Sequence, residues 1–337
     1  MSRRHFELIE HAKQATARAA LVVACALGGF ASPARSQEIP PPRLGGYFQA
    51  RETWVEPTGL TATLNRARFS IDGTLPDRFS YRALVEMESG ATARTAGIVS
   101  LRETIIRWSL APWAIQVGQF KTPFSREYVI AVPALELADF SAVVDTLAPK
   151  YELGVMAEYA APLVTLQIGA FNGEGQNAGL NRDSTVLWVG RASVRPIAQA
   201  TLAGHLARAN RDSVRYGADL SIEHAGLLVR GEFLGQWRRN RGAPGGAPGA
   251  AVSGSDDLGW YVLAGYRVLP WLQLLAKQED FQRPALGVSR RISATIGGAN
   301  LELPGGRTRF LANFVSRRTG FPRQKRNSVI GQVQVRF

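Results

Sequence analysis

The chain has 337 residues, of which 45% are hydrophobic and 20% are charged, and its formal net charge is +13 at pH 7. This hydrophobic share excludes an intrinsically disordered chain. After residue 30, no apolar run approaches the roughly 20 residues that a membrane helix needs, which excludes a helical membrane protein.

The N-terminus shows the features of a cleaved signal peptide in the right order. Basic residues precede the apolar run "AALVVACALGGF", and small residues follow it in "ASPARS". A short buried helix is the alternative interpretation, which this order of features disfavours. We therefore predict a signal peptide at 1–36 and one exported domain at 37–337. The single cysteine, Cys25, lies inside the apolar run, so the mature chain offers neither a disulfide nor a thiol site.

The charge of the mature chain narrows its partners. Residues 1–36 hold five Lys/Arg and two Asp/Glu, so the remainder carries a formal net charge of +10. A basic exported protein could bind anions, acidic lipids or nucleic acid. The arginines are scattered along alternating segments rather than massed in a tail, and we therefore expect no nucleic-acid partner.

From residue 44 onward the sequence repeats one unit, in which about ten residues of period-two alternation are followed by a turn. Runs of roughly 9 to 11 residues have the length of tilted strands that cross a bilayer. The pattern predicts sixteen strands, at 45–56, 64–75, 79–88, 100–110, 114–121, 151–160, 163–172, 185–195, 199–209, 213–224, 227–238, 258–268, 271–281, 289–302, 307–317 and 327–337.

The connections between these runs alternate in length. Every second one is tight, such as "LPDR", "APW" and "LPGG", and the others are longer and polar, including the segment 122–150 and "NRGAPGGAPGAAVSGSDD". Strict alternation of this kind is typical of an up-and-down membrane barrel with tight periplasmic turns and longer external loops. We therefore predict an all-β fold, a transmembrane antiparallel up-and-down β-barrel of about 16 strands.

The last run shows the two faces of such a wall most clearly. In "NSVIGQVQVRF" one face carries Val329, Val333, Val335 and Phe337, whereas the other face carries glutamine and arginine. Lipid-facing and lumen-facing side chains alternate in this way in a water-filled barrel. Six aromatic residues near strand ends would suit the interfacial girdles, with ordinary core aromatics as the alternative: Trp54, Trp113, Trp237, Trp260, Trp271 and Phe337.

Arginines fall repeatedly on the predicted inner face. Rings of basic side chains in a pore favour anions, and the guanidinium fork suits phosphate or carboxylate oxygens. The lumen-lining basic residues that we predict are Arg66, Arg68, Arg82, Arg107, Arg191, Arg215, Arg230 and Arg309. The alternative interpretation is that inward-facing carboxylates balance these arginines, which would leave a weakly selective lumen. The acids that we predict on the inner face are Glu52, Asp72, Glu86, Glu103, Asp219, Glu223 and Glu232.

Enzymatic chemistry finds little support in the sequence. The mature chain has only two histidines, His205 and His224, and no cysteine, so the usual zinc ligands and a thiol nucleophile are missing. We interpret His205 as a polar strand residue with a satisfied partner. We therefore predict no enzyme, no catalytic residue, no cofactor and no metal site.

One stretch identifies a resemblance to a known family. "VGQFKTPFS", residues 117–125, resembles the signature of the phosphate-selective porin O and P family of Gram-negative outer membranes. The similarity continues through "YELGVMAEY", "AFNGEGQN" and the closing "VIGQVQVRF". The resemblance implies a sixteen-stranded porin, expected to be a homotrimer, whose long third loop at about 122–150 folds into the lumen. It also implies anion binding at the constriction by Lys121 and Arg126, which match the basic positions of the motif.

The leading hypothesis is an outer-membrane porin that forms a passive, water-filled, anion-preferring diffusion channel for phosphate or polyphosphate. Its expected partners are inorganic or small organic anions and outer-membrane lipid. A non-conducting outer-membrane barrel for adhesion or structure is a second hypothesis. A secreted soluble β-sandwich that binds glycans is a third, which so much outward apolar surface disfavours.

Overall fold

The computed structural model describes residues 39–88, 98–182, 184–210, 213–239, 254–285, 288–320 and 322–337. The predicted signal peptide and most of the predicted loops at 89–97 and 240–253 lie outside these ranges. Within them, no helix is both long and apolar enough to cross a membrane. The unit formed by residues 40–337 is described below.

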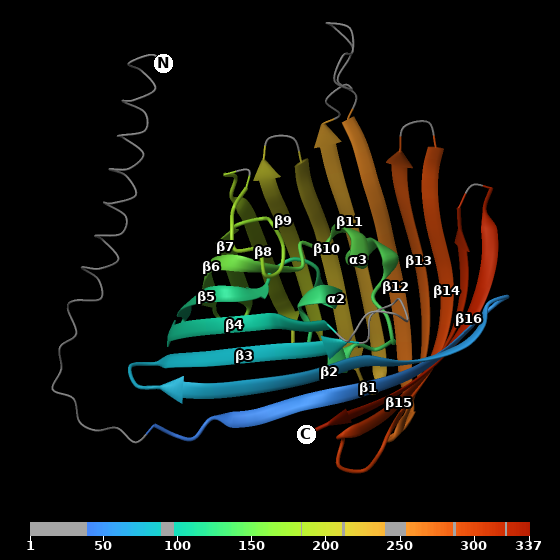
Figure 1. The fold of residues 1–337 in the computed structure, drawn as a ribbon, viewed down its shortest axis with the longest axis horizontal. Coiled ribbons are helices and arrows are strands. Elements are labelled where there is room, and N and C mark those ends of the chain that lie inside the picture. Colours follow the sequence, from blue (N-terminus) through green and yellow to red (C-terminus); the bar gives the residue numbers. More distant parts are fainter. Residues whose placement is uncertain are drawn as a thin grey trace, which may run out of the picture. The chain divides into compact units, whose positions relative to one another are not determined.

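Sixteen antiparallel strands form a closed barrel (Figure 1). Each strand pairs with its neighbour in sequence, and β1 pairs with β16 from Tyr47↔Arg336 to Val55↔Ser328, so the sheet has no free edge. The strands are β1 Arg43–Val55, β2 Gly59–Leu75, β3 Phe79–Glu88, β4 Ile98–Leu110, β5 Trp113–Lys121, β6 Tyr151–Ala160, β7 Val164–Phe171, β8 Leu187–Ile197, β9 Ala200–Asn210, β10 Ser213–His224, β11 Leu227–Arg239, β12 Gly254–Leu269, β13 Leu272–Ala285, β14 Val288–Glu302, β15 Thr308–Thr319 and β16 Gln324–Arg336.

The predicted strands match this order throughout, and β3, β6 and β10 have the predicted bounds. The largest difference is β2, which begins at Gly59 rather than at residue 64. A bulge causes it: Gln49 pairs with Arg66 and Ala50 with Leu64, so Asn65 is an extra residue that breaks the period of two. The first external connection, between β1 and β2, therefore consists only of residues 56–58. The prediction that every external connection is long is wrong at this position.

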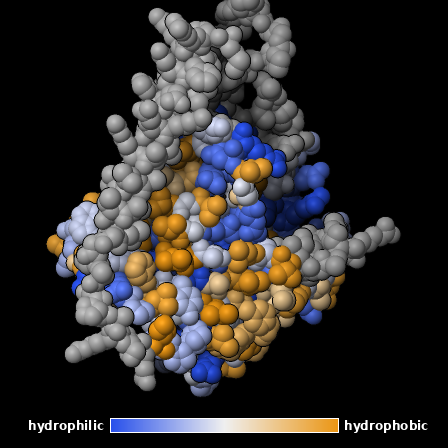
Figure 2. Space-filling view, turned by 60° about the vertical axis from the view of Figure 1, so that its left-hand side comes forward, coloured by the Kyte–Doolittle hydropathy of each residue, from blue (hydrophilic) through white to orange (hydrophobic). Residues whose placement is uncertain are grey.

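The outer face of the barrel is apolar. Large side chains such as Val117, Ile168 and Phe314 are about half exposed, and Figure 2 shows hydrophobic residues concentrated over one side of the wall. The six predicted girdle aromatics, Trp54, Trp113, Trp237, Trp260, Trp271 and Phe337, are all exposed on this surface, so they are not core residues of a soluble protein. The apolar exterior is what a lipid-embedded barrel requires.

One predicted inner acid is on the wrong face. Glu52 is exposed on the outer wall, where it pairs with Gly331, while its neighbour Arg51 points inward to Asp139. Adjacent residues of a strand point to opposite faces, so only one of this pair can face the lumen. The sequence analysis had placed Glu52 on the inner face.

Candidate functional site

The connection between β5 and β6, residues 122–150, lies inside the barrel, and we call it the constriction loop. It contains the helix α2 (Arg126–Val129), the 3-10 helix η1 (Val132–Ala134) and the helix α3 (Ala142–Leu147). Figure 1 shows α2 and α3 enclosed by the ring of strands. The loop was predicted from the family resemblance, and its contacts with inward-facing side chains show how the wall holds it.

Lys121, at the end of β5, fastens the base of the constriction loop. Its ammonium donates to the backbone carbonyls of Tyr128 at 2.7 Å and Ile130 at 2.6 Å, and lies 5.1 Å from the centre of the Tyr128 ring. Burial raises the pKa of the Tyr128 hydroxyl above its usual range, so this ring stays neutral. The Thr122 N–H donates to the Lys150 carbonyl at 3.1 Å and joins the two ends of the loop.

Glu232 of β11 anchors the first turn of the loop. Its carboxylate accepts the backbone N–H groups of Arg126 at 3.1 Å and Glu127 at 3.3 Å, and the Tyr261 hydroxyl donates to it at 3.2 Å. The Ser125 hydroxyl accepts the Tyr128 N–H and caps this short helix. Charge-assisted bonds to free helix N–H groups fix where the loop leaves the wall.

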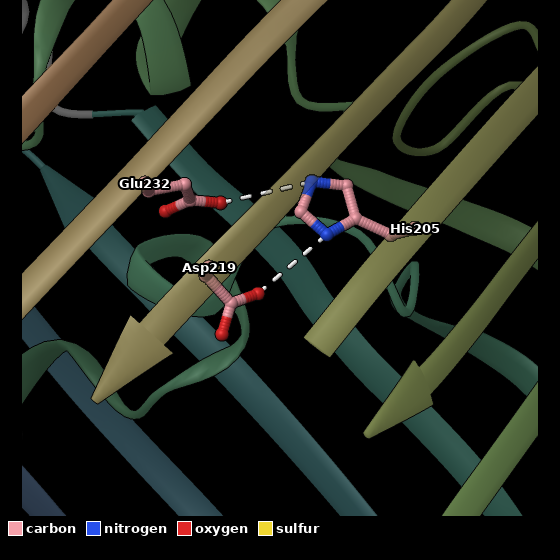
Figure 3. Close-up of side chains that lie close together, drawn as sticks. All are labelled: His205, Asp219 and Glu232. Atoms are coloured by element: carbon pink, nitrogen blue, oxygen red, sulfur yellow. Dashed lines mark ion pairs between the residues drawn. The ribbon is translucent and has the colours of Figure 1, made fainter. Parts of the chain in front are cut away.

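His205, Asp219 and Glu232 lie together beside this anchor, and Figure 3 shows the imidazole between the two carboxylates. Nδ1 faces Asp219 at 3.6 Å, whereas Nε2 faces Glu232 at 3.8 Å. Their donor atoms have the spacing of a metal site. However, the carboxylates face opposite ring nitrogens, so a metal held by one nitrogen would reach only one of them.

Arg191 supplies positive charge to the same group. Its guanidinium lies 2.7 Å from Asp219 and 3.2 Å from Nδ1 of His205. Arg191 thus occupies two of the atoms that would have to be free to bind a metal ion. The residues therefore fit an ion-pair group better than a metal centre. The Phe124 ring packs edge-on against His205, with ring centres 4.3 Å apart, which ties the group to the constriction loop.

The middle of the loop is held mainly through its backbone. Arg309 donates to the carbonyls of Pro133 at 3.3 Å and Leu135 at 2.8 Å. Amide side chains of β14, β15 and β16 also bond the loop backbone, at 2.7 to 3.1 Å. Asn300 donates to the Glu136 carbonyl and Gln334 to the Pro133 carbonyl, whereas the Asn313 side chain accepts the Ala138 N–H. Because backbone groups have to be satisfied in a buried position, these contacts specify the path of the loop.

The second half of the loop packs on β11 to β13. The Ala142 N–H donates to Glu279 at 3.3 Å, and Lys277 pairs with Glu127 at 2.7 Å. Val143, at 1% exposure, packs on Gly259, where an added Cβ would meet it at 2.7 Å. The constriction loop thus covers the inner wall formed by β11 to β16 and leaves that of β2 to β4 without comparable loop contacts among the described residues.

The inner wall of β2 to β4 is rich in arginine. Its described inward-facing side chains include three carboxylates and five arginines, Arg66, Arg68, Arg82, Arg102 and Arg107. Arg82 is 41% exposed and Arg107 28%, and they pair with Glu103 at 2.8 Å and Glu158 at 2.5 Å. These side chains reach the water that fills the lumen.

Glu86 is the centre of this wall. Its side chain is fully buried and contacts three guanidinium groups, those of Arg68 at 2.9 Å, Arg66 at 3.3 Å and Arg102. One carboxylate cannot neutralise three guanidinium groups, so positive charge remains on Arg66, which is 21% exposed.

The structure places all eight predicted lumen arginines on the inner face, in different surroundings. Arg191 pairs with Asp219, Arg230 pairs with Glu136 and Glu223, and Arg309 bonds loop carbonyls. Arg215 makes no hydrogen bond or ion pair with any residue in the described ranges, and lines a cavity of about 410 Å³ with Arg102 and Lys150.

Lys121 and Arg126 both lie at the base of the constriction loop, but neither is free. Lys121 bonds loop carbonyls, and the guanidinium of Arg126 lies 3.4 Å from Glu136 at 14% exposure. The sequence missed Arg102, because a bulge between Leu84 and Val85 turns both Arg102 and Glu103 inward. No alternation pattern signals that bulge.

A comparison with protein-family models matches residues 55–207 to the family described as phosphate-selective porin O and P. The chain is similar to that family over this segment. It is an outer-membrane porin, a non-enzymatic channel, as the sequence predicted. The match covers the wall of arginines, the constriction loop and "GQFKTPFS". A search of curated proteins gives no match.

Solved porins share the fold of this porin at low sequence identity. An anion-selective porin from Comamonas acidovorans has a TM-score of 0.66 at 11% identity, covering 88% of this chain and 99% of the other. The trimer form of OmpT from Vibrio cholerae has a TM-score of 0.64 at 11% identity, with 88% and 99% covered. The channel DcaP of Acinetobacter baumannii has a TM-score of 0.63 at 12% identity, with 88% and 97% covered. These likenesses confirm the barrel.

Proposed function

We propose that the porin is an anion-preferring diffusion channel for phosphate-like anions. The observation that carries the proposal is the inner wall of β2 to β4, where the described inward-facing side chains include five arginines and three carboxylates, with Arg66 and Arg68 sharing the buried Glu86. Arginines in a pore wall raise the local concentration of anions and lower the cost of stripping their water. The name of the matched family and that of the Comamonas acidovorans porin support the same preference.

In this proposal Lys121 and Arg126 add positive charge at the narrow section, as the family motif implies. Their hydrogen bonds to the loop also shape that section, so the exposed arginines of β2 to β4 make the larger contribution to selectivity. Exposed cations that also contact carboxylates still bind anions weakly, which lets an ion both enter and leave.

The test is the reversal potential of the purified porin in a planar bilayer under a salt gradient. We expect an anion-selective potential that falls in R66Q/R102Q, and block of chloride current by added phosphate. The matched control is R318Q/K325Q, which removes the same charge from the outer face and should leave the potential unchanged. Cation preference, or no conductance at all, would refute the proposal.

We also propose that the porin assembles as a homotrimer, an arrangement supported by the trimer form of OmpT from Vibrio cholerae. A groove of about 750 Å³ on the outer wall supports self-association. Its floor has small side chains, Ala50, Ala299, Ala312 and Gly331, beside the outward Glu52. A carboxylate facing lipid is costly, whereas a partner could pair with it. The purified porin should have the mass of three chains in mild detergent, and A312W should shift it to the monomer mass. A monomer mass of the wild type would contradict the assembly.

A further inference from the structure

Four basic side chains gather at one end of β14 to β16, on the outside of the barrel. Arg318 of β15 pairs in register with Ser293 of β14 on one side and Lys325 of β16 on the other. Arg323 donates to the Ser293 hydroxyl at 2.6 Å, and Arg291 is two residues from Ser293 on the same strand face. We call Arg291, Arg318, Arg323 and Lys325 the outer basic cluster.

The register shows that this cluster faces away from the lumen. On β14 the buried Ala294 faces inward, so Ser293 faces outward, and its register partners Arg318 and Asp280 share that face. Arg317, next to Arg318, instead points inward to Glu279 at 3.8 Å. The cluster therefore takes no part in the path along β2 to β4.

The cluster has an unbalanced charge. Asp280 bonds Arg291 through both oxygens, at 2.9 and 2.8 Å, and is the acid that contacts the cluster within the described ranges. Arg318 and Lys325 are exposed, and neither side chain makes a hydrogen bond or ion pair with another described residue. Like charges directly opposite on adjacent strands destabilise a sheet, so an anion bound between them would relieve the repulsion.

The position of the cluster selects the kind of anion. Outward positions of β15 run from Phe310 and Phe314 to Ser316 and then Arg318, and those of β16 run from Val333 and Val329 to Asn327 and then Lys325. The cations thus lie just beyond the apolar band. They are at the end of the barrel that carries the connection from β5 to β6, which is the outer side of a porin. The phosphates of outer-leaflet lipid lie at that depth.

Among the described residues, the other strands show no second group of basic side chains at the same end of the wall, where β9 carries a single outward arginine, Arg208, in register with Trp188. The outward residues near the ends of β8, β10 and β11 are the aromatics Trp188, Tyr216 and Trp237. Aromatic side chains suit an uncharged membrane interface. Four basic residues grouped on neighbouring strands indicate a local site rather than a general interfacial charge.

We propose that the outer basic cluster binds the phosphate headgroup of an outer-leaflet glycolipid. The guanidinium groups of Arg318 and Arg323 offer paired donors that match phosphate oxygens, and Lys325 adds a point charge. The acyl chains of the same lipid would lie along the apolar outer face of β15 and β16 below the headgroup. This combination of contacts favours a lipid phosphate over free phosphate, and it does not depend on anion preference in the lumen.

The test is native mass spectrometry of the intact porin in mild detergent, titrated with bisphosphorylated lipid A, with its dephosphorylated form, or with inorganic phosphate. We expect preferential binding of the phosphorylated lipid. R318Q/K325Q should bind it about thirtyfold more weakly, because each cation near an anionic lipid surface contributes a factor of about five to the affinity. The control R43Q/R307Q removes two exposed arginines from the other end of the barrel and should bind as wild type does.

Three results would overturn the proposal. Equal binding of both lipid forms would show that the phosphates are not recognised. Competition by inorganic phosphate at the concentration of the lipid would assign the cluster to free anions. Dissociation of the assembly by R318Q/K325Q, without lipid binding by the wild type, would make the cluster a contact between copies of the chain.

Discussion

Glu232 on β11 accepts a hydrogen bond from the backbone N–H of Arg126 at 3.1 Å, across 106 positions of sequence. The bond joins the wall to the first turn of the constriction loop. In E232A the N–H groups of Arg126 and Glu127 lose a charged acceptor while they stay buried, which costs about 1–3 kcal/mol. We expect single-channel current of E232A to show more open-state noise than the wild type, because the loop is then fixed less firmly.

The control for that experiment is E302A, which removes an exposed carboxylate that pairs with Arg267 at 3.3 Å and makes no contact with the loop in the described structure. Open-state noise in E232A equal to that of E302A would show that the anchor does not hold the loop.

Gly298 of β14 lies beneath Leu137 of the constriction loop. A Cβ at Gly298 would meet the Leu137 side chain at 2.7 Å and that of Asn313 at 2.9 Å. We expect G298A to destabilise the folded barrel by about 1–3 kcal/mol through overpacking, measured as a lower temperature for loss of its folded gel mobility. L137A makes space for the added methyl group, so G298A should lower the transition temperature less in the L137A background than in the wild type.

The neighbouring Gly297 is the matched control for G298A. It faces outward, and a Cβ added there would meet no atom within 4 Å, so G297A should leave the transition temperature unchanged. If G297A and G298A lowered it equally, backbone freedom rather than contact with the loop would explain the glycines.

The wall of this porin was largely predictable because each strand carries its own evidence. In β10, alternation alone placed Tyr216 outward and Asp219 inward, and the bounds needed no other information. The prediction was wrong where the local period is broken. Asn65 is inserted as a bulge in β2, and Glu52 follows directly after the inward Arg51.

The candidate site was less predictable, because it depends on partners that are distant in sequence. Arg66 and Arg309 have the same inward direction, yet Arg66 faces lumen water while Arg309 bonds the carbonyls of the constriction loop. Only the path of that loop separates the two roles. The same holds for Lys121, whose ammonium donates to the carbonyls of Tyr128 and Ile130, two residues outside the motif at 117–125.

Removing the negative charge of Glu103 tests whether anions pass along the wall of β2 to β4. Its expected effect on selectivity is opposite to that of removing arginines. The Glu103 side chain is 15% exposed and pairs with the more exposed Arg82. In E103Q, Arg82 keeps Asp72 as its carboxylate partner at 3.0 Å, but the wall gains one unit of positive charge. The anion to cation permeability ratio should rise by about fourfold, because one unit charge at about 10 Å in water changes the local concentrations of anions and cations by about twofold each, in opposite directions. The gain should shrink at high salt, where such charges are screened.

The reversal potential of E103Q, measured at low and high salt, checks this expectation. D145N is a suitable control, since Asp145 is an exposed acid whose partner Lys150 lies in the constriction loop rather than on the arginine wall. A shift toward cations in E103Q would contradict a path along this wall.

Lys121 allows the role of charge to be separated from the role of hydrogen bonding. K121M keeps much of the side-chain length but removes both the charge and the bonds to the carbonyls of Tyr128 and Ile130. We expect more open-state noise in K121M and a smaller loss of anion preference than in R66Q/R102Q, because the ammonium is already occupied by the loop. K121R, which keeps the charge, should retain the selectivity even where its fit to the carbonyls is poorer. A loss of anion preference in K121M larger than that in R66Q/R102Q would instead make Lys121 the principal anion site of the channel.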